Sequence, residues 1–110
     1  MNKRRHQRME VSNLVADVSD GNGFFSGYVK DISHHGMLLH DIPQKFNDNA
    51  KKLSLVVSGN GKNFKMQAIP RWSGSDGSGK KIGLKLVNIS YNWTQFVMDM
   101  APQPIDAWGY

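Results

Sequence analysis

The sequence predicts a mostly β domain, either a small antiparallel barrel or a sandwich, with a single helix near its C-terminal end. Three observations lead to this class. About six short runs alternate apolar and polar residues along residues 9–87, and Gly, Asn, Asp and Ser separate them. Residues 92–101 instead repeat their apolar side chains with the period of a helix. With 110 residues and 39% hydrophobic content, the chain fits one domain with a modest core.

The first part of the chain contains three predicted strands. Residues 1–8 have no apolar pattern, so we expect a flexible basic arm there. Residues 9–18 are a first strand, and the turn residues 19–23 join it to a second strand over residues 24–33. Alternation along this second strand puts Val29, Asp31 and Ser33 on one face, with Tyr28 and Ile32 on the other. A short third strand covers residues 37–40.

Three further strands follow the loop at residues 43–49. Residues 53–57 alternate clearly, as do residues 64–72, where Pro70 predicts a sheet edge or a bulge and Trp72 continues the apolar series. Residues 73–81 are rich in Gly and Ser and predict a flexible turn, which lacks the Lys-Ser/Thr end of a phosphate-binding P-loop. The last strand spans residues 82–86.

The helix carries one apolar stripe, which we expect to pack against the barrel: Trp93, Phe96, Val97 and Met100. Asn92 and Gln95 have the spacing of a capping box, and Ala101 and Pro102 end the segment. We therefore divide the chain into an arm (residues 1–8), a barrel with its helix (residues 9–101) and a tail (residues 102–110).

Charge and composition narrow the function. The net charge is +5, and basic side chains concentrate in residues 3–8, which is typical of either a solvated tail or an arm that meets phosphate. There is no cysteine and no apolar run long enough to span a membrane, and no apolar segment of a secretory signal follows the basic start. We expect a cytoplasmic protein.

Two motifs carry the candidate chemistry. Arg4 and Arg8 lie four residues apart, so their guanidinium groups can converge on one ligand and pair with phosphate oxygens or a guanine edge. Asp31, Ser33 and Gly36 offer a carboxylate for guanine N–H donors, a hydroxyl, and a glycine that permits positive φ or close backbone approach. The second motif is also an ordinary strand-to-turn sequence, in which Asp and Ser cap backbone amides.

Other sites are disfavoured. His34 and His35, with Asp31, His40 and Asp41 nearby, have metal-ligand chemistry, but adjacent histidines on a strand point apart, so we expect no metal site. No catalytic triad or carboxylate pair is recognisable, and we expect no enzyme activity and no cofactor. Arg71 and Trp72 are either accessory site residues or ordinary strand residues, and the alternation favours the latter slightly.

In order and context, these motifs resemble the PilZ domain family. Arg4 and Arg8 precede the first strand, and Asp31, Ser33 and Gly36 follow at the end of the second. The later run at residues 82–86 is similar to the family's closing strand, although Leu86 stands where Phe is common, and an amphipathic helix follows. The resemblance covers nearly the whole chain and implies a six-stranded antiparallel split barrel.

The resemblance also implies a ligand, the bacterial second messenger cyclic di-GMP. Arg4 and Arg8 would clamp its phosphates and guanine faces, Asp31 and Ser33 would read guanine, and Gly36 would shape the turn. Lys3 and Arg5 are accessory candidates. In the family the residue at Lys3 influences whether one molecule or an intercalated pair binds, so the stoichiometry stays open.

The resulting hypothesis is a receptor that changes conformation on binding and signals to an unidentified protein partner. Two alternatives stay open. A small basic barrel could bind RNA or single-stranded DNA, with Phe24, Phe25 and Tyr28 as stacking platforms, although this gives no reason for Asp31 and Ser33. The second alternative is a PilZ-like adaptor that does not bind the ligand. The arginine pair and the Asp31-Ser33-Gly36 motif are both intact, which argues against this alternative.

Overall fold

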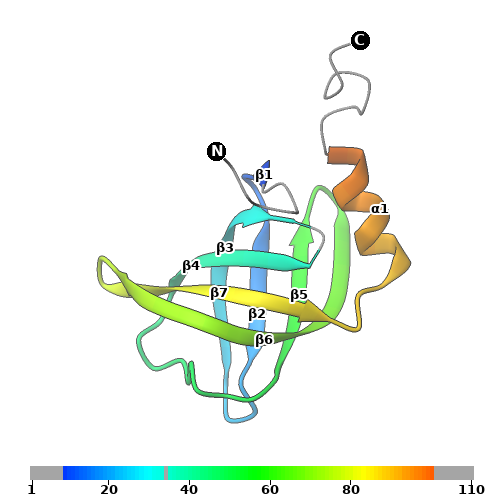
Figure 1. The fold of residues 1–110 in the computed structure, drawn as a ribbon. Helices are drawn as coiled ribbons and strands as arrows, with labels where there is room; N and C mark the ends of the chain where they lie inside the picture. Colours follow the sequence, from blue (N-terminus) through cyan, green and yellow to red (C-terminus); the bar gives the residue numbers. More distant parts are fainter. Residues whose placement is uncertain (1–8, 34, 101–110) are drawn as a thin grey trace, which may run out of the picture.

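The computed structural model describes residues 9–33 and 35–100, which form seven strands and one helix (Figure 1). The elements are β1 (Met9–Glu10), β2 (Val15–Ser19), β3 (Phe24–Ile32), β4 (Gly36–Ile42), β5 (Leu53–Gly59), β6 (Lys62–Asp76), β7 (Gly79–Val87) and α1 (Tyr91–Met100). The predicted arm and tail lie outside these residues. No helix in the described part of the chain is long and apolar enough to cross a lipid bilayer.

The strands form a closed antiparallel barrel. Six of them follow the order β3-β2-β5-β6-β7-β4, and β4 pairs back with β3 to complete the ring. β1 is an additional short strand that pairs with β3. The predicted six-stranded antiparallel barrel with one helix after it is confirmed.

The predicted strand over residues 9–18 is divided into β1 and β2. Asn13 between them has a φ of +68°, which an extended strand does not allow. Both parts nevertheless follow β3, because Met9 pairs with Ile32 and Val15 with Tyr28. One edge of β3 is therefore covered from Phe24 to Ile32 by a single, interrupted segment.

Inward-facing side chains from the six barrel strands fill the core. Val18, Leu39, Leu55 and Ile82 are almost inaccessible to solvent, and Leu86 is buried with them. Every fully buried side chain within residues 9–33 and 35–100 is hydrophobic. Hydrophobic burial is thus the main contribution to stability here.

A bulge in β3 changes which residues face outward. The pairing between β3 and β4 shifts register between Val29 and Asp31, so one extra residue interrupts the alternation. Val29 and Ile32 are both buried, whereas Asp31 is partly exposed. The predicted shared face of Val29 and Asp31 is therefore wrong. The bulge leaves the Asp31 carboxylate accessible to solvent.

A second bulge lies in β6, where Pro70 predicted an edge or a bulge. Pro70 pairs with Leu84 and Trp72 with Gly83, so Arg71 is the extra residue. Phe64, Met66 and Ala68 point into the core before the bulge, but Trp72 after it is 46% exposed. The expectation that Trp72 continues the apolar series is wrong, because the bulge reverses the alternation.

The predicted flexible turn at residues 73–81 is also wrong. β6 extends to Asp76 and β7 starts at Gly79, which leaves only residues 77 and 78 as the turn. Gly77 has a φ of +64°, a conformation that glycine adopts at little cost. Residues 73–81 are thus rich in Gly and Ser although they belong to a long hairpin and not to a flexible loop.

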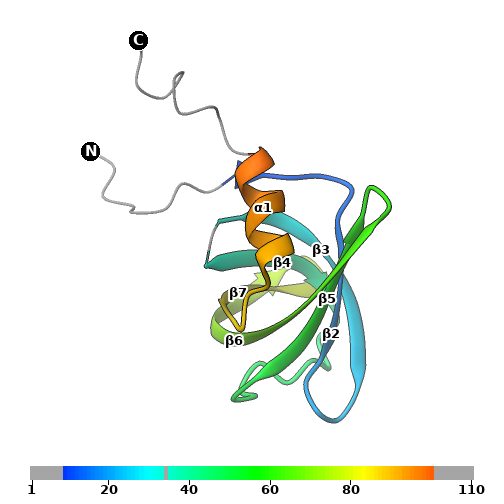
Figure 2. The same cartoon turned by 90° about the vertical axis from the view of Figure 1, so that its right-hand side faces the viewer.

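The helix α1 lies beside the end of the barrel at which β1 is found (Figures 1 and 2). Trp93, Phe96 and Val97 are buried, and the rings of Trp93 and Phe96 contact Phe64 of β6. Met100 is 41% exposed and does not belong to the buried stripe. The N-cap is Ser90, whose hydroxyl accepts a hydrogen bond from the N–H of Trp93, so the predicted Asn92 cap is wrong.

Candidate functional site

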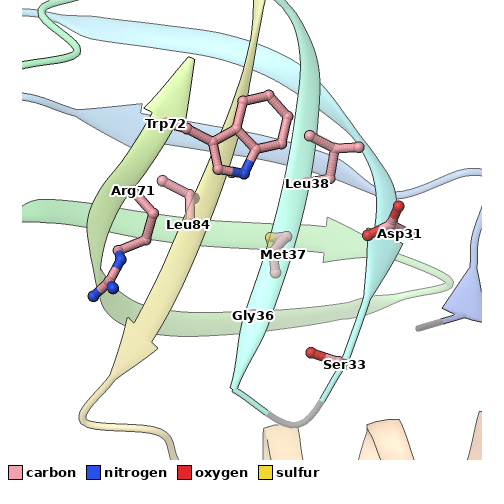
Figure 3. A pocket seen from close by; sticks show the side chains of 9 residues that line it. Asp31, Ser33, Gly36, Met37, Leu38, Arg71, Trp72 and Leu84 are labelled. Carbon is pink, nitrogen blue, oxygen red and sulfur yellow. The ribbon is translucent and has the colours of Figure 1, made fainter. Parts of the chain in front are cut away.

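A pocket of about 220 Å³ opens on the outer wall of the barrel, where β3, β4, β6 and β7 meet (Figure 3). Nine residues line it: Asp31, Ser33, Gly36, Met37, Leu38, Arg71, Trp72, Gly83 and Leu84. The structure thus brings all three members of the second motif together with both accessory candidates from β6.

Asp31 projects from the end of β3 into this pocket. Its backbone pairs with Glu10 of β1 on one side and Leu38 of β4 on the other, so neighbouring strands fix its position. The β3 bulge turns its carboxylate away from the core and toward the pocket (Figure 3). A carboxylate held in this way can accept the N–H donors of a guanine edge.

Ser33 and Gly36 shape the turn below Asp31. The N–H of Ser33 donates to the carbonyl of Gly36 at 3.0 Å and closes the connection between β3 and β4. A Cβ at Gly36 would lie 3.3 Å from the Ser33 hydroxyl oxygen and 3.4 Å from the Leu84 carbonyl oxygen. Gly36 is not among the positive-φ residues of the described chain, so close approach explains the glycine.

Trp72 forms the opposite wall of the pocket. Its indole lies across β7 toward Leu38 and covers Gly83 (Figure 3). A Cβ at Gly83 would come within 2.3 Å of the indole nitrogen, so only glycine leaves room for the ring. The half-exposed indole offers a flat apolar face next to the polar groups of Asp31 and Ser33, as a stacking surface for a base requires.

Arg71 adds a positive charge to the same edge. As the extra residue of the β6 bulge, it is exposed and lines the pocket, where its guanidinium can pair with phosphate. Arg71 and Trp72 also line a neighbouring hollow of about 370 Å³ with Asp48 and Ser73. The Ser73 hydroxyl and the Lys80 ammonium hydrogen-bond to Asp48 and hold the pKa of its carboxyl below the usual value.

Four candidate residues lie outside the described residues: Lys3, Arg4, Arg5 and Arg8. The described chain begins with Met9 of β1, which pairs with Ile32, one residue before the pocket residue Ser33.

Sequence reasoning missed Met37, Leu38, Gly83 and Leu84 as pocket residues. The first two are near Gly36 in sequence, but β7 joins the site only through its register with β4 and β6. One signal was present at Gly83, because a glycine inside a strand often marks close approach by another group.

The sequence and the fold were compared with those of known proteins. The family model described as PilZ domain matches residues 2–92. A search of curated protein sequences found no match.

Three of the solved structures that share this fold are similar to this chain over most of its length. The Bacillus subtilis inhibitor of motility MotI/DgrA has a TM-score of 0.69 and 16% identity over 90% of this chain, which spans 49% of that protein. The PilZ domain of YcgR from Escherichia coli with c-di-GMP has a TM-score of 0.62 and 16% identity, covering 88% of this chain and 87% of that one. The PilZ domain of CeSA from a cellulose-synthesizing bacterium has a TM-score of 0.57 and 13% identity, covering 84% and 91%.

Proposed function

Because the chain belongs to the PilZ domain family, we propose that it is a bacterial, cytoplasmic receptor for cyclic di-GMP that signals to a protein partner. The observation that carries the proposal is the pocket itself. Asp31, Ser33 and Gly36 line one hollow, and β1, the first described strand, pairs with the part of β3 that carries Asp31.

The pocket's chemistry suits a ligand that has both purines and phosphates. The carboxylate of Asp31 would accept the guanine N–H donors, and the exposed face of Trp72 would stack against a base. Arg4, Arg8 and Arg71 would neutralise phosphates. An intercalated ligand pair carries four phosphates. These three arginines would neutralise phosphates of such a pair as well as those of one molecule.

Affinity requires several of these contacts at once. Ordering the backbone of an eight-residue arm costs roughly 1 to 2 kcal/mol per residue. Micromolar binding needs a net gain of about 8 kcal/mol. One contact cannot both offset the cost of ordering the arm and supply this net gain. Replacing one arginine or Asp31 should therefore weaken binding strongly.

Calorimetric titration with cyclic di-GMP tests the proposal. We expect micromolar binding by the unmodified chain and a loss of about 10- to 100-fold on Arg8→Ala or Asp31→Ala, because each removes charge-assisted hydrogen bonds. Lys51→Ala and Asp99→Ala are matched controls, since both residues are exposed and neither lines the pocket. Absence of heat at high micromolar ligand, with folded protein shown by circular dichroism, would rule out the receptor.

Signalling would depend on the arm. We expect ligand saturation to change the backbone relaxation of residues 1–8 in NMR, because Arg4 and Arg8 would become fixed on the ligand and alter the surface offered to a partner. Unchanged relaxation at saturation would exclude this mechanism.

Nucleic-acid binding is the second candidate. Phe24 is 87% exposed and Tyr28 is 52% exposed, on the same face of β3, so both rings are accessible for stacking. Tight, strongly salt-dependent oligonucleotide binding without preference for the cyclic dinucleotide would favour it. The pocket gives Asp31 a role that this alternative leaves unexplained.

A further inference from the structure

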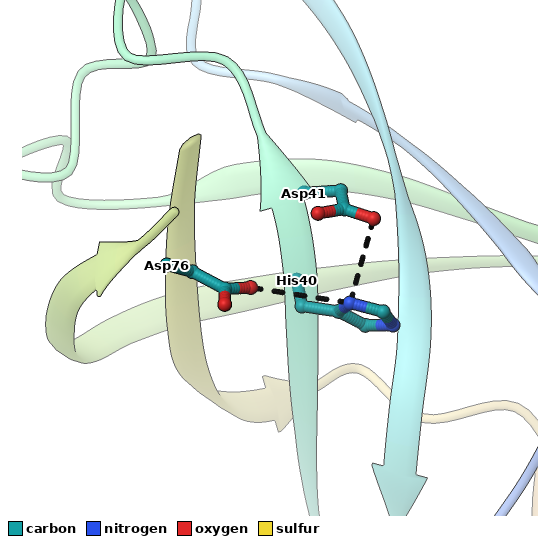
Figure 4. A group of neighbouring side chains, drawn as sticks. All are labelled: His40, Asp41 and Asp76. Carbon is teal, nitrogen blue, oxygen red and sulfur yellow. Dashed lines mark ion pairs between the residues drawn. The ribbon is translucent and has the colours of Figure 1, made fainter. Parts of the chain in front are cut away.

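One histidine and two carboxylates converge outside the pocket (Figure 4). His40 and Asp41 belong to β4, and Asp76 is the last residue of β6. The Nδ1 atom of His40 lies 3.6 Å from a carboxylate oxygen of Asp41 and 3.9 Å from one of Asp76. One ligand-type atom from each residue fits within a span of 4.8 Å.

The convergence depends on an unusual backbone at Asp41. Neighbouring residues in a regular strand point to opposite faces, so His40 and Asp41 would normally diverge. Asp41 instead has a φ of +61°, and the pairing of β4 with β7 shifts register between Leu39 and Ile42. Both side chains consequently turn toward Asp76. The expectation of no metal site rested on the adjacent histidines His34 and His35, and not on the geometry of His40 and Asp41.

Contacts between the hairpin and β4 hold the third ligand in place. The Gln44 amide donates hydrogen bonds to the carbonyls of Ser78 and Gly79, at 3.3 and 2.9 Å. At Gly79 the hairpin approaches β4 so closely that a Cβ would lie 2.8 Å from the Ile42 carbonyl oxygen. The turn that follows Asp76 is thus fixed against the strand that carries the other two groups.

Lys80 of the same hairpin is bonded elsewhere. Its ammonium donates to the Phe46 carbonyl and pairs with Asp48. Within the described parts of the chain, the ion pairs of Asp41 and Asp76 are formed with His40. Two acidic groups therefore face one imidazole nitrogen, and among the described residues neither forms a salt bridge with a lysine or arginine.

We propose that His40, Asp41 and Asp76 bind a divalent transition-metal ion, with Zn²⁺ as the probe. Imidazole nitrogen and carboxylate oxygen are a suitable donor set for zinc. In a tetrahedral zinc site with bonds of about 2.1 Å, two ligand atoms lie about 3.4 Å apart. The His40 nitrogen is 3.6 and 3.9 Å from the two carboxylate oxygens, and one ligand atom from each residue lies within 4.8 Å of the others. Binding of the ion would draw the three side chains closer together.

The site is open to solvent on one side. The side chains of His40, Asp41 and Asp76 are 34%, 57% and 35% exposed, so an ion can enter and water can complete its coordination. The ion would join the end of β6 to the end of β4, the two strands that carry Trp72 and Gly36 of the pocket. Its effect would be to strengthen the attachment of the hairpin to β4 that Gln44 already provides.

Calorimetry with Zn²⁺ on the 110-residue chain without an affinity tag tests the proposal. We expect one micromolar site in the unmodified chain and an affinity at least tenfold weaker in Asp76→Asn and in His40→Gln. Asp99→Asn and His35→Gln are the matched controls and should bind as the unmodified chain does. Asp76→Asn is the sharper variant, because it leaves every histidine in place.

A second readout separates this site from binding by other histidines. In imidazole NMR spectra, Zn²⁺ should shift the ring signals of His40, whereas Mg²⁺, which prefers oxygen ligands, should not. Unchanged affinity in both Asp76→Asn and His40→Gln, or unmoved His40 signals at saturating Zn²⁺, would overturn the proposal. So would the absence of Zn²⁺ binding at 100-fold molar excess.

Discussion

Two glycines give the pocket its shape at the scale of single residues. At Gly36 the absence of a Cβ relieves a tight approach of the Ser33 hydroxyl, and at Gly83 it makes room for the indole of Trp72. Each position sets how near a neighbouring group can come. Neither needs a positive φ, so space and not backbone conformation explains the residue.

Gly83→Ala should therefore displace Trp72. The added methyl group would overlap the indole nitrogen, so the ring must rotate away from β7. We expect the indole N–H signal of Trp72 to move in NMR spectra while that of the buried Trp93 stays in place. Gly74→Ala is the matched control, because nothing lies within 4 Å of its added Cβ. Equal spectra for the two variants would contradict the packing described.

The sequence predicts those parts of the site whose residues are close together along the chain. Asp31, Ser33 and Gly36 form a local motif, and the pocket brings them together. Trp72 and Gly83 meet only through the register of β6 with β7, which depends on one bulged residue. Local patterns carry no information about such a distant pairing, so the role of Trp72 as a pocket wall required the structure.

At the scale of elements, the helix illustrates how two plausible caps compete. Both Ser90 and Asn92 are good N-cap residues, and the sequence spacing favoured Asn92. The structure starts α1 at Tyr91, and the Ser90 hydroxyl accepts the hydrogen bond of the Trp93 N–H. Sequence spacing alone does not show which of two neighbouring polar residues makes this bond.

Ser90→Ala should destabilise the domain by about 1 kcal/mol, since it removes the hydroxyl that accepts the Trp93 N–H. Asn92→Ala should cost little, because residue 92 lies inside the first turn and is exposed. Chemical denaturation followed by circular dichroism measures both changes. A larger loss for Asn92→Ala would mean that the helix begins two residues later.

Strand boundaries were predictable where alternation was regular. β5 starts at the predicted residue, β7 contains the predicted strand 82–86 but begins three residues earlier, and the bulge in β6 was signalled by Pro70. The hairpin at residues 73–81 was not, because Gly and Ser are typical of loops even where cross-strand hydrogen bonds order them. Asp76 pairs with Gly79 directly across the turn, and composition alone does not reveal this.

At the scale of the whole molecule, surface carboxylates connect loops to the barrel. Asp20 accepts hydrogen bonds from the backbone N–H groups of Asn22, Gly23 and Asn47, and these lower its pKa. The pKa of Asp48 is also lowered, first by the Ser73 hydroxyl. Each carboxylate links the loop before β5 to another part of the chain.

Stability should therefore depend on acid pH. A carboxyl whose pKa is lower in the folded state stabilises that state above its ordinary pKa of 3.8, and this contribution is lost as pH falls through the lowered value. We expect the free energy of unfolding to decrease below pH 3.8, and to decrease less steeply in the double variant Asp20→Asn/Asp48→Asn. Urea denaturation at a series of pH values checks this, and equal slopes for both proteins would refute it.

The bulge at Arg71 has a consequence for how the chain tolerates a change of length. Deleting this one residue would leave Pro70 opposite Leu84 and Trp72 opposite Gly83, so the side chains on both sides of position 71 would keep their faces. The pocket would lose the guanidinium but would keep its indole wall. A single-codon deletion here would thus remove one charge from a recognition surface without shifting the strand register.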